Sequence, residues 1–182
     1  MLQYTKQQQY FCTYPSPIGE LTLASDGERL TWLCIQGQRF FTDLSCHTEA
    51  EDLPIFVQTR RWLDIYFSGK CPDFTPPLAP TGSDFRQRVW NMLLTIPYGQ
   101  VVTYGSIAQT LAPSSAGKAM SAQAVGGAVG HNPISIIIPC HRVIGAKGNL
   151  TGYGSGIAKK IQLLELEHVD TSAFFMPKHS FL

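Results

Sequence analysis

The adjacent residues Cys140 and His141 join a nucleophile to the side chain best suited to activate it. A thiol attacks as its thiolate, and forming a thiolate near neutral pH requires a base or a positively charged neighbour. Histidine titrates nearest to neutral pH, so His141 is the candidate base. A carboxylate must then orient the imidazole, and Glu165 and Glu167 are the only acidic residues between positions 140 and 170. The pattern predicts covalent chemistry at Cys140.

The cysteines have two other possible uses. Cysteine is among the most buried residue types, so a Cys-His pair without further context favours a structural role. Cys34, Cys46 and His47 lie near one another in the sequence, but their spacing matches no structural zinc site. We therefore expect no metal and no cofactor.

The segments on either side of Cys140 predict the elements that position it. Residues 134–138 form a short apolar run that is consistent with a buried strand, and a glycine-rich loop follows over 145–156. Upstream, Ser83 can cap a helix over residues 84–96. A last helix is expected over about 157–168, with Ile157, Ile161, Leu164 and His168 near one face.

Two short helices are predicted between these segments. Thr103 is a good N-cap for a helix that ends at Leu111, a turn region follows over 112–117, and small residues fill 119–130. Short helices joined by a tight turn suggest a helix-turn-helix. Gly126 and Gly127 would let the backbone approach a phosphate or a narrow groove closely. Tight packing between helices is the competing explanation, and it is favoured when this segment is taken alone.

The first 80 residues predict a different architecture. Alternating apolar residues over 18–25, an Asp-Gly turn signal and an apolar run over 30–35 indicate a β-hairpin. A helix is expected over about 54–67, with Phe67 near its apolar face. The four prolines within 71–82 cannot continue a helix or a central strand. We expect domains over 1–80 and 81–170, followed by a tail over 171–182.

Composition narrows the classes of function. The chain has 182 residues and is 44% hydrophobic, enough for one core or for two small cores in contact. Residues 1–83 hold six Lys or Arg against nine Asp or Glu, and residues 84–182 hold eight against four. A polyanion would prefer the second half, unless this asymmetry is ordinary scatter.

The N-terminal sequence and the spacing of the cysteines predict the localisation. The N-terminus is polar, without the apolar stretch of a signal peptide, and the five cysteines include no CxxC pair. No apolar run approaches the length of a membrane span. We expect a cytoplasmic protein with reduced thiols and no membrane partner.

Three segments around the candidate nucleophile resemble one protein family. The string NPISIIIPCHRVIG (132–145) resembles the active-site signature of the O6-alkylguanine-DNA alkyltransferases, and IPYGQVVTYGSIA (96–108) and GNLTGYGSGIAKKIQLLELE (148–167) match the same family. The likeness is close over 85–167, whereas residues 1–80 are similar in layout more than in motif. The resemblance implies an α+β fold, with an N-terminal ribonuclease-H-like α/β domain and a C-terminal helix-turn-helix, winged-helix-like alkyltransferase domain.

The resemblance also implies a reaction. Family members bind double-stranded DNA through the minor groove, flip the damaged nucleotide out and transfer the alkyl group of O6-alkylguanine, and of O4-alkylthymine, to a cysteine. The thioether that forms does not hydrolyse, so each molecule acts once. The expected partner is therefore double-stranded DNA carrying O6-alkylguanine, and the expected state is a monomer.

Residue roles carried over by position complete the predicted site. Cys140 would be the alkyl acceptor and His141 the base, acting through a water. Glu167, rather than Glu165, matches the carboxylate that holds His141. Asn132 would support the active-site turn. Tyr104 would act on the target's flanking phosphate and on the flipped base.

The remaining roles concern the substrate. The backbone carbonyls of Cys140 and Val143 would accept hydrogen bonds from the guanine amino group. Tyr153 would line the pocket, and Lys160 would stabilise the leaving base or its surroundings. The residues expected to meet DNA are Thr103, Gln123, Gly126 and Gly127.

Two positions depart from the family pattern. Gln123 stands where most members have the arginine that enters the base stack, which suggests weaker binding or a different way of assisting the flip. Gly154 replaces a common serine beside the pocket tyrosine, so that a hydroxyl is lost and the pocket gains room. We expect this room to allow bulky adducts such as O6-benzylguanine.

Two rival functions remain to be tested. A Cys-His-Glu hydrolase or acyltransferase would turn over through a thioester, but the helix-turn-helix region would then have no role. A DNA-binding regulator or damage sensor would need no nucleophile, whereas this chain retains Cys140, His141 and Glu167.

Overall fold

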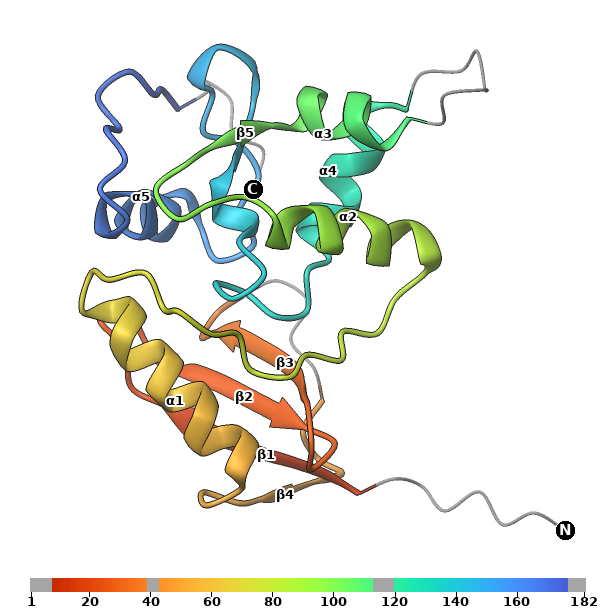
Figure 1. Ribbon diagram of the computed structural model, residues 1–182, viewed down its shortest axis with the longest axis vertical. Helices are drawn as coiled ribbons and strands as arrows, with labels where there is room; N and C mark the ends of the chain where they lie inside the picture. Colours follow the sequence, from red (N-terminus) through yellow and green to blue (C-terminus); the bar gives the residue numbers. More distant parts are fainter. Residues whose placement is uncertain (1–7, 39–42, 113–119, 177–182) are drawn as a thin grey trace, which may run out of the picture.

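The first half of the chain folds as a small sheet with one helix across it (Figure 1). The computed structural model describes residues 8–38, 43–112 and 120–176. The sheet has the strand order β3-β2-β1-β4, in which β1 is antiparallel to β2 and parallel to β4, and β2 is antiparallel to β3. Its elements are β1 (Gln9–Tyr14), β2 (Leu21–Ser25), β3 (Leu30–Ile35), β4 (His47–Glu49) and α1 (Pro54–Phe67).

The predicted hairpin and the predicted helix over 54–67 are both confirmed. β2 and β3 pair with Leu23 opposite Leu33, and Gly27 takes a φ of 101° in the turn between them. Pro54 stands at the start of α1, where its missing N–H would have no helical partner. Phe67 packs against the core, as its place near the apolar face predicted, but it is only partly buried, whereas Tyr66 beside it is fully buried.

The second half consists of short helices around a two-stranded parallel sheet. Ser83, Thr103 and Ser121 each accept a backbone hydrogen bond as N-cap of α2, α3 and α4, so three helix starts are fixed by side chains. The elements are α2 (Asp84–Leu94), β5 (Val102–Thr103), α3 (Tyr104–Leu111), α4 (Ala122–Gly130), the 3-10 helix Cys140–Arg142, β6 (Val143–Ile144), the 3-10 helix Ala146–Gly148 and α5 (Ile157–Leu166).

The helices of the predicted helix-turn-helix pack against each other and against α2. Trp90 on α2 is buried and donates its indole N–H to the carbonyl of Ala128 on α4 at 2.9 Å. β5 pairs with β6, which brings the start of α3 beside the segment that follows Cys140. Most of the turn predicted over 112–117 lies outside the described residues.

The outer edge of β3 joins the two halves. Leu30 pairs with Leu78 of the proline-rich segment, and Leu33 pairs with Ile134 through hydrogen bonds of 2.9 and 2.8 Å. An edge strand with unpaired backbone groups invites pairing, and here both stretches of the edge are used within the chain. The segment leading to Cys140 is therefore held on the sheet of the first half.

The strand predicted over 134–138 is wrong. Only Ile134 makes a bridge, and the next residues form turns. Ile136 has a φ of 70°, which ends any extended conformation there. The run is apolar because it is buried between the two halves, not because it belongs to a ladder. A short buried run does not distinguish these cases.

Most buried apolar side chains of the two halves form one shared core, and Ile144, Leu150 and Leu164 form a second, smaller cluster in the second half. All five cysteines are free, with Cys12, Cys34 and Cys140 buried and Cys46 and Cys71 exposed. Within the described ranges, no helix combines the length and apolar character needed to span a bilayer.

Candidate active site

The turn that precedes Cys140 is held by one side chain. Asn132 is buried and donates its amide N–H groups to the carbonyls of Ile138 at 2.8 Å and Ile134 at 3.3 Å, while its oxygen accepts from the N–H of Ile134 at 3.1 Å. These three hydrogen bonds lie within the turn, so Asn132 fixes the shape of residues 132–138.

The same turn contains strained backbone. Ile136 has a φ of 70°, and the N–H of Ile137 reaches back to the carbonyl of Ser135 at 2.8 Å, which closes a γ-turn. A β-branched residue at positive φ is unfavourable and persists only where the surroundings enforce it. Here the enforcement comes from Asn132 and from the pairing of Ile134 with β3.

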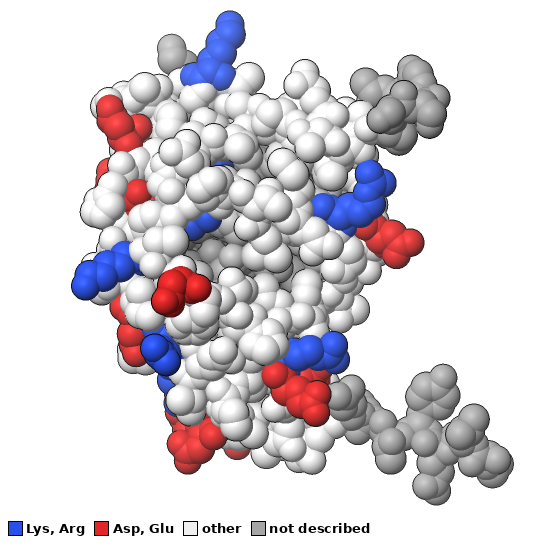
Figure 2. Space-filling view, in the orientation of Figure 1, with Lys and Arg blue, Asp and Glu red and all other residues white. Residues whose placement is uncertain are grey.

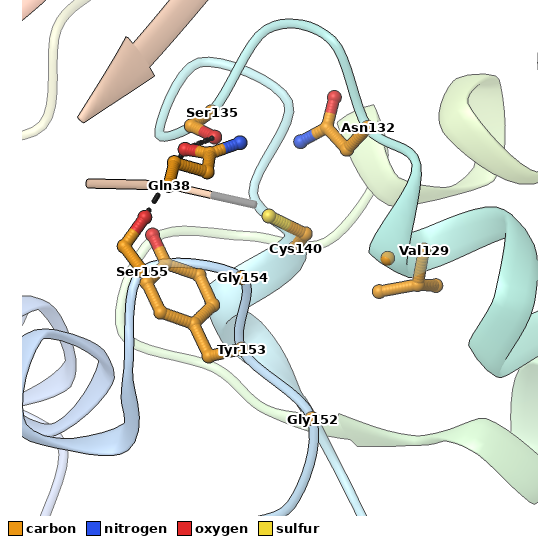
Figure 3. Close-up of a pocket in the computed structure, with 10 residues that line it drawn as sticks. Gln38, Val129, Asn132, Ser135, Cys140, Gly152, Tyr153, Gly154 and Ser155 are labelled. Atoms are coloured by element: carbon orange, nitrogen blue, oxygen red, sulfur yellow. Dashed lines mark hydrogen bonds between the residues drawn. The ribbon is translucent and has the colours of Figure 1, made fainter. Parts of the chain in front are cut away.

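Cys140 opens a single 3-10 turn at the wall of a small pocket (Figure 3). The pocket lies between the active-site turn, the end of α4 and the glycine-rich loop. Its volume is about 10 Å³, enough for about one water. Its lining residues are Gln38, Val129, Gly130, Asn132, Ser135, Cys140, Gly152, Tyr153, Gly154 and Ser155.

The surroundings keep the thiol protonated at rest. Burial raises the pKa of Cys140, while the side chain of Asn132 and the ammonium of Lys160 act in the opposite direction. Lys160 is itself buried and donates to the carbonyls of Val143 at 2.6 Å and Thr151 at 3.1 Å. Burial lowers the pKa of Lys160 to about 8.

His141 belongs to a buried hydrogen-bonded cluster behind the pocket. Its Nε2 lies 2.6 Å from Oε1 of Glu167, and Tyr66 donates its hydroxyl to the same oxygen at 2.7 Å. Arg142 donates to both carboxylate oxygens, from Nε at 2.8 Å and from Nη2 at 3.0 Å, and the N–H of Gly99 adds a contact of 3.1 Å. Glu167 thus accepts five hydrogen bonds.

The charges in this cluster follow from these contacts. Burial opposes ionisation of Glu167, but the hydrogen bonds from His141 and Arg142 and the positive charge of Arg142 outweigh it and lower its pKa to about 2. Burial lowers the pKa of His141, and Glu167 offsets part of this effect. The resting cluster is therefore an ionised Glu167 paired with Arg142, next to a neutral imidazole.

The tautomer of His141 follows from the same geometry. A carboxylate only accepts hydrogen bonds, so Nε2 carries the proton and Nδ1 carries the free lone pair. Nδ1 is buried without a hydrogen-bond partner in the described part of the chain. This nitrogen is available to take a proton from a neighbouring acid.

The end of α5 places Glu167 in the cluster. Glu167 is the C-cap, and His168 follows with a φ of 62°. The N–H groups of His168 and Val169 bond the carbonyls of Glu165 and Leu164, which is a Schellman motif. Glu165 is exposed and accepts from Thr171, so of the two candidate carboxylates only Glu167 reaches His141. The expected helical face ending at His168 is wrong, because His168 lies outside the helix and is exposed.

The other predicted site residues divide between the pocket and its surroundings. Asn132, Tyr153 and Gly154 line the pocket with Cys140. The hydroxyl of Tyr153 is buried without a partner among the residues described. Tyr104 lies beside the pocket, donating to the carbonyls of Thr151 and Gly152 at 3.3 and 3.4 Å.

The predicted DNA-contacting residues lie away from the pocket. Thr103 caps α3 through a capping box with Ser106. Gln123 and Gly127 are exposed on α4, and Gly126 packs beside the ring of Tyr104. Residues 120–130 contain no charged side chain. A Cβ at Gly127 would meet no atom within 4 Å, so packing inside the protein does not require glycine there.

Several residues of the site were not predicted from the sequence, among them the pocket-lining Val129, Gly130, Gly152 and Ser155. Arg142 was quoted only within the motif, although it neutralises Glu167. Ser135 and Gln38 line the pocket, and Tyr66 enters the histidine cluster from α1. Tyr66 continues the helical spacing of buried Ile55, Thr59 and Trp62, which was the one available signal.

Neither the charged residues on the face that Figure 2 draws nor the possible metal ligands among the described residues point to an additional site. Figure 2 shows Lys and Arg side chains spread over both halves of the face that it draws, without a continuous basic patch among the residues described there. Nowhere in residues 8–38, 43–112 or 120–176 do three His, Cys, Asp or Glu side chains group as metal ligands would.

Comparison with known proteins matches both halves to one family. Residues 9–80 match the ribonuclease-like domain of 6-O-methylguanine DNA methyltransferase, and residues 84–169 match its DNA binding domain. The chain is 48% identical over 158 residues to a methylated-DNA--protein-cysteine methyltransferase of Mycobacterium tuberculosis, covering 87% of this chain and 92% of that protein. It is 41% identical over 161 residues to the Haemophilus influenzae protein of the same name, covering 88% and 87%.

Solved structures support the same likeness. The crystal structure of Mycobacterium tuberculosis O6-methylguanine methyltransferase has a TM-score of 0.76 and 46% identity, covering 94% of this chain and 97% of that one. The Mycobacterium tuberculosis OGT in complex with DNA has a TM-score of 0.75 and 49% identity, covering 87% and 92%. The two-part α+β fold predicted from the sequence is thereby confirmed.

Proposed function

The chain belongs to the 6-O-methylguanine DNA methyltransferase family, and we propose that it repairs DNA by moving the alkyl group from O6 of guanine to the sulfur of Cys140. The observation that carries this proposal is that a nucleophile and a base are neighbours in the chain. A buried thiol faces a pocket, and a neutral imidazole with a free Nδ1 stands in the next position of the chain. The pairing supplies a nucleophile and a base for it.

The proton leaves the thiol first. Nδ1 of His141 takes it, directly or through one water, and the carboxylate of Glu167 stabilises the resulting imidazolium. The positive charge of Lys160 favours the thiolate as it forms. Because burial disfavours an isolated thiolate, the sulfur becomes strongly nucleophilic only during the transfer.

The thiolate then attacks the alkyl carbon. A C–S bond forms as the C–O6 bond breaks, and the bonding pair of the broken bond goes to the guanine oxygen. The guanine takes up a proton and is restored to ordinary guanine. The proton lost by the thiol is therefore balanced by the proton that the guanine gains. A hydroxyl donor near O6 lowers this barrier, and the hydroxyls of Tyr104 and of Tyr153 are the nearest candidates.

DNA is expected to meet α4. Its exposed residues are small or uncharged, which suits the minor groove, where little sequence information is displayed. The target base would flip into the pocket, at a cost that is lower for a damaged pair. Gln123 is exposed in the first turn of α4, in position to enter the stack. We extend the proposed substrates to O4-alkylthymine in duplex DNA and the proposed working state to a monomer.

Intact mass measurement tests the proposal. After incubation with duplex DNA containing O6-methylguanine, the protein should gain one methyl group, located on Cys140 by peptide mapping. Cys140→Ala should gain none and should still bind the duplex. A wild-type chain that binds this DNA but remains unmodified would indicate a sensor, and repeated turnover of an ester without DNA would indicate a hydrolase.

A further inference from the structure

The pocket beside Cys140 is entered by a side chain from the other half of the molecule. Gln38 follows β3, and Figure 3 shows its side chain between the active-site turn and the glycine-rich loop. Its Oε1 accepts hydrogen bonds from Ser135 Oγ at 2.9 Å, on the turn, and from Ser155 Oγ at 3.1 Å, on the loop. Gln38 therefore bridges two opposite walls of the pocket.

Local backbone geometry sets the position of Gln38. Its N–H bonds the carbonyl of Ile35 at 2.9 Å, and Gly37 takes a φ of 81° inside this turn. Oε1 of Gln38 also accepts from the N–H of Ile35 at 3.3 Å. The tip of the side chain is thus held by three hydrogen bonds, one from the backbone of β3 and two from serine hydroxyls.

Gln38 fills the space that the missing side chain at Gly154 leaves open. A Cβ built on Gly154 would lie 3.4 Å from Cγ of Gln38. With Gln38 in place the cavity measures only about 10 Å³. That space holds about one water, so neither a purine nor an alkyl substituent fits until part of the wall moves.

We propose that Gln38 determines the size of the alkyl group that the pocket accepts, acting as a removable wall beside Gly154. This inference rests on the proposed function. The reacting carbon must come within about 3–3.5 Å of the sulfur of Cys140. A larger substituent on that carbon then extends into the volume that Gln38 and Ser155 occupy. Gly154 provides room for bulky adducts only when Gln38 withdraws.

The hydrogen bonds of Gln38 make the wall firm but breakable. Its displacement breaks the two serine contacts and the bond from the Ile35 N–H, and water or substrate can satisfy the freed groups. A methyl adduct requires a smaller displacement than a benzyl adduct. The size preference should therefore appear in the ratio of the two transfer rates.

The experiment measures transfer rates for O6-methylguanine and O6-benzylguanine placed in the same duplex, by quantifying S-alkylation of the intact protein. In Gln38→Ala the ratio of benzyl rate to methyl rate should rise about tenfold, the equivalent of one or two hydrogen bonds and the packing that they hold. Ser155→Ala, which removes one of the two serine contacts, should give a smaller rise. Gln36→Ala is the matched control, because Gln36 is exposed on the same turn and does not line the pocket.

The outcomes separate this inference from the function on which it rests. An unchanged or lower benzyl-to-methyl ratio in Gln38→Ala, with methyl transfer still measurable, would overturn the role of Gln38 alone. A rise of the same size in Gln36→Ala would also overturn it, because the effect would then belong to the turn. If the wild-type chain transfers neither group, the proposed function fails, and the role of Gln38 fails with it.

Discussion

Substitution of Gly127 by alanine should stabilise the protein and weaken its binding to DNA. Gly127 lies in the interior of α4 and is exposed. A Cβ there would meet no atom within 4 Å, and the backbone is not at positive φ. The folded protein therefore gains nothing from glycine at this position. We therefore expect Gly127 to allow DNA to approach the backbone of α4 closely.

The two effects have opposite signs and separate origins. Glycine inside a helix costs about 1 kcal/mol relative to alanine. For a chain of this size, that gain should raise the unfolding temperature by about 2–4 °C. A methyl group forced into a close-packed contact costs about 1–3 kcal/mol. At about 1.4 kcal/mol for each factor of ten, the Kd for duplex DNA should rise by about 5- to 150-fold.

Thermal unfolding and fluorescence anisotropy with a labelled duplex, at one fixed salt concentration, measure the two effects. Gly127→Leu should weaken binding further, because the obstruction grows with the side chain. Gln58→Ala, at an exposed position of α1, is the control and should leave the Kd unchanged. An unchanged Kd for Gly127→Ala alongside a raised unfolding temperature would refute the close approach of α4 to DNA. A lowered unfolding temperature would refute the claim that a Cβ fits.

Further predictions concern the histidine cluster. Glu167→Gln should slow alkyl transfer and also destabilise the fold by about 3–5 kcal/mol, because Arg142 is left without its partner. The rate of S-methylation measures the first effect, and urea denaturation measures the second. The pKa of Glu167 in the folded protein, about 2, lies below its ordinary value of 4.5. Its contribution of about 3 kcal/mol to stability is therefore present above pH 4.5 and is lost as the pH falls toward 2. Denaturation of wild type and Glu167→Gln at several pH values should show this loss in the wild type only. Tyr66→Phe removes a hydrogen bond to Glu167, and the less compensated carboxylate favours protonation of His141. The acid limb of the pH profile of the transfer rate should therefore move to higher pH. Tyr98→Phe, which loses only a hydrogen bond to the Leu166 carbonyl, is the control and should leave the profile unchanged.

Local chemistry explains what the sequence predicted well. Ser83 and Thr103 have side chains that satisfy orphan N–H groups, so the starts of α2 and α3 could be located from residue type alone. The hairpin of β2 and β3 followed from alternation on both sides of an Asp-Gly turn. Strand β1 was missed although it pairs along the centre of the sheet, because its residues QYFCTY do not alternate clearly. N-cap residues and turn residues were therefore sufficient to locate the helix starts and the hairpin, because each depends on only a few neighbouring positions.

The parts of the site that escaped prediction depend on contacts between distant segments. Tyr66 and Glu167 are 101 residues apart, and Gln38 and Ser155 are 117 apart. Neither pair has a spacing that periodicity could detect. The apolar run 134–138 failed for the same reason, because its conformation is set by Asn132 and by the edge of β3 rather than by its own pattern. Such contacts follow only from the way the two halves pack.

The resting electrostatics of the site suit the proposed transfer, in which each molecule would react once. A permanently ionised thiol would be exposed to oxidants and to every electrophile that enters the pocket, and irreversible loss of Cys140 would end the molecule's use. Burial instead keeps the thiol neutral, and Gln38 leaves room for little more than a water beside it. The base is also kept neutral, with its free nitrogen ready and its cation stabilised in advance by Glu167. On the proposed mechanism, reactivity would therefore be created by the arrival of the substrate, which would open the pocket and bring the alkyl carbon to the new thiolate.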